Sequence, residues 1–416
     1  MRKVLVIGSG GRCHAICKKL RESTKVSQIY CAPGNAGTSE VAINVPYQVT
    51  EIDKLLNFAL KEEIDLTVVG PEQSLELGVV DKFEEAGLKV FGPRKDAALI
   101  ETSKSFAKDL MKKYDIPTAD YEIFTNYDDC IKYLESCSYP IVIKYDGLAA
   151  GKGVTIPSDF ESAKKDIDEI FLDNKYSTSK VVIEEFLAGE EFSYMVFTDG
   201  INVYPMIPSQ DHKRAYDNDL GPNTGGMGAY TGLSFLTKED EEYALEHIMK
   251  KTVSALKSEN KEFKGVLYGG LIKTANGIRV IEFNARFGDP ETEVVLSSLI
   301  SDLYDVFYDI IENKAPTLIW DKRPTLGVVL AAKGYPGDYK KGGIINILKL
   351  VDGYIYHMGT KIVDGNLTIN GGRVLMVVNK GFTLEEAIVN TYNMIKDIDC
   401  DDLFYRKDIG AKSLKE

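Results

Sequence analysis

The first hundred or so residues alternate short apolar stretches with helix-like stretches, and this alternation constrains the fold more than any other feature of the chain. Strands are expected at 3–7, 28–31, 65–69 and 89–91, and helices at 14–22, 51–62 and 75–86. Strands that alternate with helices of this length predict a parallel sheet with helical crossovers. Ligands of such a sheet lie at the carboxyl ends of its strands, where this chain carries GSGG, APGN and VVGPE.

The sequence GSGGRCHA follows the first strand and raises the question of a dinucleotide-binding loop. Gly8, Gly10 and Gly11 stand between a strand and a helix, as such a loop requires. However, Cys13 stands where the third small residue belongs, and the second strand runs into APGN instead of ending in an acidic residue. An NAD oxidoreductase is therefore disfavoured, and the free N–H groups at a helix N-terminus predict an anion such as phosphate.

Composition excludes several classes of partner. The chain has 416 residues and a net charge of −13, which argues against nucleic acid as the main ligand. Its six cysteines form no Cys-x-x-Cys pair, which predicts free thiols in a reducing compartment. No charged-then-apolar leader and no apolar stretch of membrane-spanning length is present, so we expect a cytoplasmic protein with no membrane partner.

Beyond residue 95 the pattern changes. The sequence predicts one long helix over 96–114, a compact strand–helix–strand segment over 119–188, and a strand-rich region with a long Gly/Asn loop at 208–232, helices at 238–258 and 292–313, and closing strands from 325. A loop of this length inside a compact domain is typically functional or disordered.

The segment IKYDGLAAGKGV ends an apolar strand at Lys144 and continues with Gly151, Lys152 and Gly153. It is not a P-loop, because its spacing is short by one residue and a strand follows instead of a helix. A glycine-rich hairpin can fold over a nucleotide's phosphates through its N–H groups and one lysine. An ordinary flexible hairpin explains the segment equally well.

The segment GIRVIEFNARFGDPET carries a stronger signal. Because strand residues alternate faces, Glu282, Asn284 and Arg286 share one side. A carboxylate and an amide oxygen suit Mg²⁺, and an arginine beside them suits a phosphoryl or carboxylate group. The alternative is a solvated strand face, which the acidic, turn-rich sequel FGDPE makes less favoured.

These segments together resemble the ATP-grasp superfamily and, within it, the phosphoribosylamine–glycine ligase family. The resemblance covers nearly the whole chain and rests on segments such as APGNAGT, VVGPE, VVIEEFLAGEE, SQDHKR, GPNTGGMGAY, IEFNARFGDPET, LAAKGYPGDY, NGGRVL and FYRKDIG. It implies an α/β ATP-grasp fold with a Rossmann-like parallel-sheet domain at 1–100, an ATP-grasp domain at 101–324 and a small α+β domain at 325–416. Residues 119–188 would form a mobile lid.

The resemblance also implies the site residues. ATP would lie between two antiparallel sheets, held by Lys104, Lys144, Gly151, Lys152, Gly153, Glu184, Glu185, Leu187 and Glu191. Glu282 and Asn284 would bind Mg²⁺ or Mn²⁺. The residues expected to act in catalysis are Arg286, Lys213, Asp211 and Asp289. The residues expected to bind glycine and 5-phosphoribosylamine are Gly10, Gly11, Asn35, Asn223, Gly225, Gly226 and Glu291.

The activity that the resemblance implies is ATP-dependent ligation of glycine to 5-phosphoribosylamine by a monomer in purine biosynthesis. Two other interpretations stay open: another ATP-grasp carboxylate–amine ligase of purine metabolism, which SQDHKR and GPNTGGMGAY disfavour, and a nucleotide-binding module that has lost catalysis. The second is suggested by Cys13, which stands where the family usually has Glu. Tyr145 replaces a usual Ala, and Lys333 a usual Gly.

Overall fold

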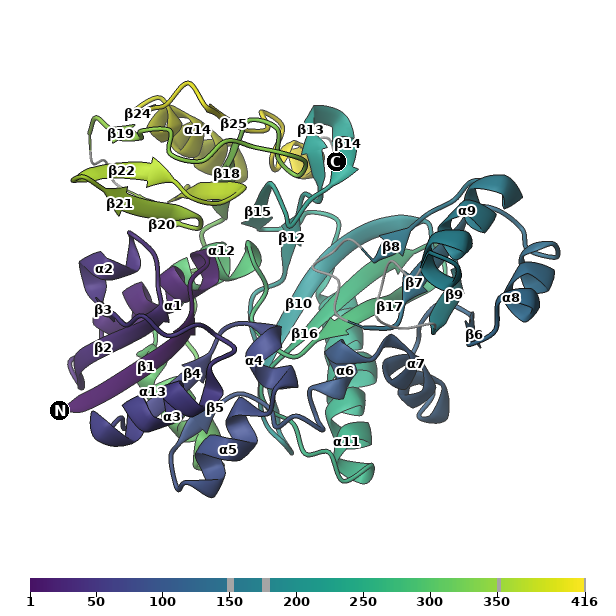
Figure 1. Ribbon diagram of the computed structural model, residues 1–416, viewed down its shortest axis with the longest axis horizontal. Coiled ribbons are helices and arrows are strands. Elements are labelled where there is room, and N and C mark those ends of the chain that lie inside the picture. The colour runs from purple at the N-terminus through teal and green to yellow at the C-terminus, as the bar shows by residue number, and fades with distance from the viewer. Residues whose placement is uncertain (148–152, 174–179, 350–352, 415–416) are drawn as a thin grey trace.

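The computed structural model describes residues 1–147, 153–173, 180–349 and 353–414 (Figure 1). Figure 1 shows the N-terminal sheet at the lower left, long strands in the middle, a separate small sheet at the right and the C-terminal strands at the top. In this part of the chain no helix combines the length and the apolar character that crossing a membrane requires.

The N-terminal sheet is parallel, as the alternating pattern predicts, but it has five strands, because the short β3 adds to the four that were expected. Its spatial order is β3 (Ile43–Asn44), β2 (Val26–Pro33), β1 (Arg2–Gly8), β4 (Leu66–Val69) and β5 (Val90–Phe91). Its helices are α1 (Gly11–Arg21), α2 (Thr38–Val41), α3 (Ile52–Lys61), α4 (Glu72–Glu76) and α5 (Val79–Glu85). The strand order reverses at β1, so GSGG and VVGPE meet at the same sheet edge.

The long helix expected over 96–114 is two helices, α6 (Leu99–Thr102) and α7 (Lys104–Lys113). Ser103 has extended backbone angles, and its hydroxyl accepts the N–H of Phe106, so it ends one helix and caps the next. The apolar pattern continues across this break. For that reason the pattern alone predicted a single helix.

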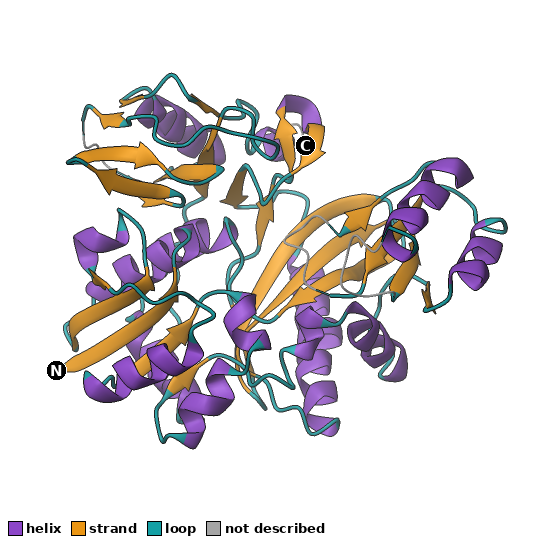
Figure 2. Cartoon of the chain, viewed as in Figure 1, coloured by secondary structure: helices purple, strands orange, loops and turns teal. Residues whose placement is uncertain are grey.

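The lid segment forms a four-stranded antiparallel sheet of its own. Its order is β6 (Tyr121–Phe124), β9 (Val181–Glu185), β7 (Ile141–Tyr145) and β8 (Val154–Thr155), accompanied by α8 (Tyr127–Leu134) and α9 (Phe160–Phe171). Its buried apolar residues form a separate cluster, whereas those of the N-terminal sheet mix with residues from beyond 190. Figure 2 shows the strands of the lid segment in orange and its two helices in purple at the right of the molecule. The lid segment therefore has its own core.

The central sheet has ten strands and continues into the C-terminal region. Its main order is β17 (Gly277–Asn284), β16 (Lys264–Thr274), β10 (Gly189–Asp199), β12 (Ser209–Asp211), β15 (Gly228–Thr231), β18 (Thr325–Ala332), β23 (Arg373–Lys380) and β20 (Tyr354–His357), with β11 (Val203–Pro205) on β10 and β25 (Leu403–Phe404) on β18. The expected loop at 208–232 is thus largely short strands, namely β12, β13 (Arg214–Tyr216), β14 (Leu220–Asn223) and β15, with the turn η1 (Asp217–Asp219).

The remaining elements cover this sheet. They are α10 (Lys238–Tyr243), η2 (Ala244–Met249), α11 (Lys250–Ser258), α12 (Glu291–Ser297), α13 (Leu303–Ile311), β19 (Asn346–Ile347), β21 (Thr360–Val363), β22 (Asn366–Ile369), α14 (Leu384–Ile395), β24 (Ile398–Asp399) and η3 (Ala411–Leu414). The expected helix at 292–313 is two helices, because Asp302 caps α13 by accepting the N–H of Tyr304. Helix α12 is buried along its whole length and contacts α1, β15 and β18.

Candidate active site

A cavity of about 670 Å³ lies between the lid sheet and the central sheet. Its walls come from α7, β7, β9, β10, β12 and β17 and from the turn after β17. Most of the predicted site residues line it: Lys104, Lys144, Gly153, Glu184, Glu185, Leu187, Glu191, Asp211, Lys213, Asn223, Gly225, Glu282, Asn284, Arg286, Asp289 and Glu291. Segments that are distant in sequence therefore converge on one cavity.

Six predicted residues are not among those that line the cavity. Gly151 and Lys152 lie outside the described residues. Gly226 lies behind the wall, where its φ of +110° and the contact with Pro290 leave no room for a side chain. Asn35 donates to the carbonyls of Ser9 and His357, and its Oδ1 accepts two N–H groups, so its side chain joins α1's loop to β20.

The N-terminus of α1, with Gly10 and Gly11, lies close to two carboxyl groups, those of Asp289 and Glu293. The N–H of Arg12 donates to Asp289 Oδ2 over 3.4 Å. A side chain at Gly11 would meet Glu293 Oε1 at 2.2 Å. Two carboxyl groups thus face the first turn of α1, and burial raises the pKa of Glu293 well above its usual value. The predicted phosphate at Gly10 and Gly11 receives no support from this arrangement.

Cys13 does not face the cavity. Its side chain is 3% exposed, and its Sγ lies 3.6 Å from the carbonyl of Ile7 under the end of β1. A glutamate there would have to enter the packed space beside Gly8 and Gly70.

Of the three residues predicted to share one strand face, Glu282 and Asn284 lie on β17, and Arg286 lies two residues beyond its end but contacts Asn284. Arg286 Nη2 donates to Asn284 Oδ1 over 3.3 Å and lies 2.9 Å from Glu101 Oε1. Its Nε lies 3.3 Å from Glu72 Oε2. These carboxylates come from α4 and α6, so three segments hold the guanidinium in place.

Neighbouring positive charges favour the ionised form of Glu282. Burial by itself would raise its pKa, but the positive charges of Lys213, Lys144, Lys104 and Arg286 outweigh burial and lower it. Lys104 donates to the carbonyl of Gly147 over 2.8 Å. An anionic Glu282 with the amide oxygen of Asn284 is a donor set that suits a hard divalent cation completed by phosphate oxygens. Among the described residues, no group of three or more His, Cys, Asp or Glu side chains is gathered as a metal site.

Glu184, one of the residues expected to hold ATP, has two lysines as side-chain partners. Its carboxylate lies 2.9 Å from Lys144 Nζ and 2.8 Å from Lys108 Nζ, and all three side chains are almost fully buried. Glu185 instead pairs with Arg279 at 3.2 Å.

The cavity also carries the other residues expected to act in catalysis, Lys213, Asp211 and Asp289, each beside a charged neighbour. Lys213 Nζ lies 2.6 Å from Glu191 Oε2, and Arg373 Nη1 lies 2.9 Å from Asp289 Oδ1. Burial raises the pKa of Asp211 to about 7; Lys213 opposes this shift, and Glu291 and Glu191 add to it. This part of the cavity therefore has charges of both signs.

Several cavity residues were assigned no role from the sequence: Glu72, Glu101, Lys108 and Arg373. The segment NGGRVL contains Arg373 but carries no motif that assigns it a role. His212, in the segment SQDHKR, is buried. Burial lowers its pKa to about 3, so the imidazole stays neutral and does not act as an acid at ordinary pH.

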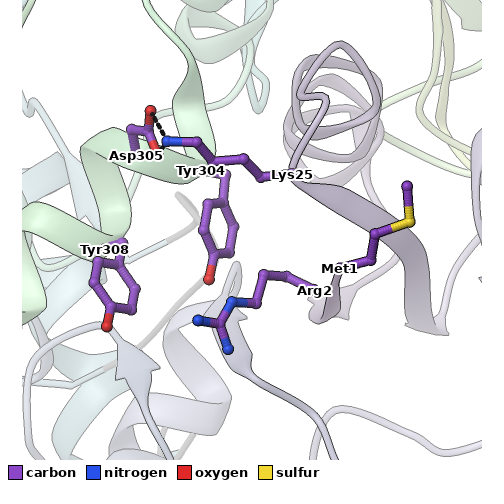
Figure 3. A pocket seen from close by; sticks show the side chains of 6 residues that line it. All are labelled: Met1, Arg2, Lys25, Tyr304, Asp305 and Tyr308. Atoms are coloured by element: carbon purple, nitrogen blue, oxygen red, sulfur yellow. Dashed lines mark hydrogen bonds and ion pairs between the residues drawn. The ribbon is translucent and has the colours of Figure 1, made fainter.

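A second, smaller cavity of about 380 Å³ opens at the start of β1 beside α13 (Figure 3). Its lining holds the exposed ion pair of Lys25 with Asp305, together with Arg2, Tyr304 and Tyr308. It contains none of the predicted site residues, so the larger cavity remains the candidate site.

Comparisons with known proteins agree with the geometry. Family models described as the phosphoribosylglycinamide synthetase N domain, ATP-grasp (A) domain and C domain match residues 2–101, 102–292 and 325–412. A phosphoribosylamine–glycine ligase of Halalkalibacterium halodurans is 50% identical, over 99% of this chain and 97% of the relative. One of Listeria innocua is 48% identical, over 99% of both chains.

Solved structures agree as well. The crystal structure of a Thermotoga maritima phosphoribosylamine–glycine ligase superposes with a TM-score of 0.88 at 33% identity, covering 98% of this chain and 99% of that one. A biotin carboxylase domain from Hydrogenobacter thermophilus, at 15% identity and a TM-score of 0.76, shares the fold over 97% of this chain and 91% of its own. With its cavity, its sheets and these matches, the chain belongs to the phosphoribosylglycinamide synthetase family of ATP-grasp ligases.

Proposed function

We propose that the chain joins glycine to 5-phosphoribosylamine at the expense of ATP, giving glycinamide ribonucleotide, ADP and phosphate. The observation that carries the proposal is the single cavity that gathers Lys104, Lys144, Glu282, Asn284 and Arg286. This set suits a nucleoside triphosphate with a divalent cation, and the family match supplies the substrates.

In this proposal Lys104 and Lys144 bind the phosphates, and Glu282 with Asn284 holds Mg²⁺ or Mn²⁺. The bound cation would supply charge neutralisation at the phosphate oxygens. Arg286, fixed by Glu72 and Glu101, directs its guanidinium to the transferring phosphoryl group. Catalysis of this kind is mainly positioning and electrostatic stabilisation.

The chemistry has two steps. The glycine carboxylate attacks the γ-phosphorus and releases ADP, forming glycyl phosphate. The amine of phosphoribosylamine then attacks the acyl carbon, and phosphate and one proton leave as the amide forms. The amine is already nucleophilic, so the step needs no strong base. Asp289 and Glu291 would line the amine side, and Lys213 and Asp211 the phosphoribosyl side.

Further parts of the proposal concern the molecule as a whole. We place the enzyme in the cytoplasm, as a monomer that acts on small molecules; its six cysteines are free thiols in the structure, which agrees with a reducing compartment. The domain boundaries near residues 100 and 324, and lid motion of 119–188, are part of the same proposal.

The test is ADP formation with each substrate omitted in turn. ADP should appear only when ATP, Mg²⁺, glycine and phosphoribosylamine are all present, and mass spectrometry should find glycinamide ribonucleotide. ADP release that ignores glycine would indicate a different ligase of this superfamily. Absence of any product would contradict the assignment.

A further inference from the structure

Lys108 is buried beside the proposed phosphate site although it belongs to no recognised motif. It lies on α7 and is 2% exposed. Its Nζ lies 2.8 Å from Glu184 Oε2 and donates to Thr118 Oγ1 over 2.7 Å. The Thr118 hydroxyl in turn donates to the carbonyl of Val280 on β17 over 2.8 Å. The ammonium is thus fixed between the lid sheet and the central sheet.

Glu184 shares its carboxylate between Lys108 and a second lysine. Lys144 Nζ lies 2.9 Å from Glu184 Oε1 and donates to the carbonyl of Ile281 over 2.8 Å. Glu184 and Lys144 come from the paired lid strands β9 and β7. The side chains of the three charged residues are 3–4% exposed, so water screens their interactions weakly.

The three buried groups carry two positive charges and one negative charge. Without Lys108, Glu184 would neutralise Lys144, and this group of side chains would present no net charge to an anion. Burial lowers the pKa of Lys108 to about 8, while Glu184 opposes that fall.

We propose that Lys108 is a positioning residue: by sharing the charge of Glu184, it leaves Lys144 with net positive charge for the nucleotide's phosphates. The inference rests on the proposed function, because that function assigns the phosphate contact to Lys144. Lys108 itself is held by Glu184 and Thr118. It acts on Lys144 through the shared carboxylate of Glu184.

The experiment compares binding of Mg·ADP and of adenosine by calorimetry. Lys108→Met should weaken Mg·ADP about tenfold, which corresponds to about 1.4 kcal/mol, and should leave adenosine binding unchanged because adenosine carries no phosphate. Lys108→Arg keeps the charge and should stay close to the native protein. KM for ATP should rise, while KM for glycine should not.

The decisive variant is Lys108→Met combined with Glu184→Gln. It restores a net charge of one through Lys144, so Mg·ADP affinity should return to within about threefold of native. If Lys108 only supports the fold, the double variant should bind no better than the single one, and adenosine should weaken in parallel with ADP. Either result overturns the inference, as does an unaltered ADP affinity in Lys108→Met.

A control separates this inference from the proposed function. Lys144→Met should weaken Mg·ADP more than Lys108→Met does. If Lys144→Met leaves Mg·ADP affinity unaltered, the assigned phosphate site itself is wrong. If Lys144→Met weakens Mg·ADP but Lys108→Met does not, only the role of Lys108 fails.

Discussion

Replacing Arg286 by methionine should lower both the stability of the fold and the rate of catalysis, for different reasons. A second substitution should distinguish the two effects. Arg286 lies 2.9 Å from Glu101, which is 8% exposed and also accepts the N–H of Ala285. Arg286→Met leaves that carboxylate without its cation. Breaking a buried ion pair by removing one partner costs about 3–5 kcal/mol.

The loss of unfolding free energy caused by Arg286→Met should fall at the lower end of that range. Burial already raises the pKa of Glu101, and Arg286 holds it down. Without the arginine, the pKa of Glu101 should rise further, so the carboxylate can be neutralised by a proton more readily, which limits the penalty. We expect the free energy of unfolding to fall by about 3 kcal/mol, measured by urea titration.

The double variant Arg286→Met with Glu101→Gln removes both members of the pair. Its unfolding free energy should recover most of the loss, because the more buried carboxylate is neutralised, and Glu72, the other partner of Arg286, is 24% exposed and partly solvated. Its kcat should stay about a hundredfold to a thousandfold low, the usual loss when a group that stabilises the transition state is removed. Recovery of kcat together with stability would refute the catalytic role of Arg286 and leave it a structural residue.

Three further predictions concern other parts of the site. Glu282→Gln should lower turnover and raise the Mg²⁺ concentration needed for half-maximal rate, whereas Glu190→Gln, also in the cavity, should not; equal Mg²⁺ titrations would remove Glu282 from the metal site. A non-hydrolysable ATP analogue should slow trypsin cleavage within 119–188 and leave cleavage at Lys250 unaltered; equal rates in the lid would argue against closure. The folded protein keeps the Asp211 proton up to about pH 7, whereas an ordinary Asp loses it near 3.8, so this group lowers the free energy of unfolding as pH rises between these values. Asp211→Asn should flatten that part of the stability profile, and an unaltered profile would show that Asp211 titrates normally.

The sequence predicted those features that local periodicity determines. The alternation of strands and helices indicated the parallel sheet, and the two-residue period placed Glu282 and Asn284 on one face. Each follows from the geometry of a single element. The breaks at Ser103 and Asp302 were missed, because a capping residue inside an apolar pattern looks like an ordinary helix position.

The arrangement of charges depends on contacts between distant segments. Lys108, Glu184 and Lys144 are separated by tens of residues. The pairing of β7 with β9 brings Lys144 to Glu184, and the docking of α7 against the lid sheet brings Lys108 to it, each within 3 Å of the carboxylate. Contacts between distant segments also bring Glu72 and Glu101 to Arg286, and they bring Asp289 to the first turn of α1. Side-chain type and local spacing identify the groups that can carry out this chemistry. Burial and ion pairing set the charge states of those groups. Burial and pairing arise only in the tertiary structure, because only there is water excluded from around the side chains.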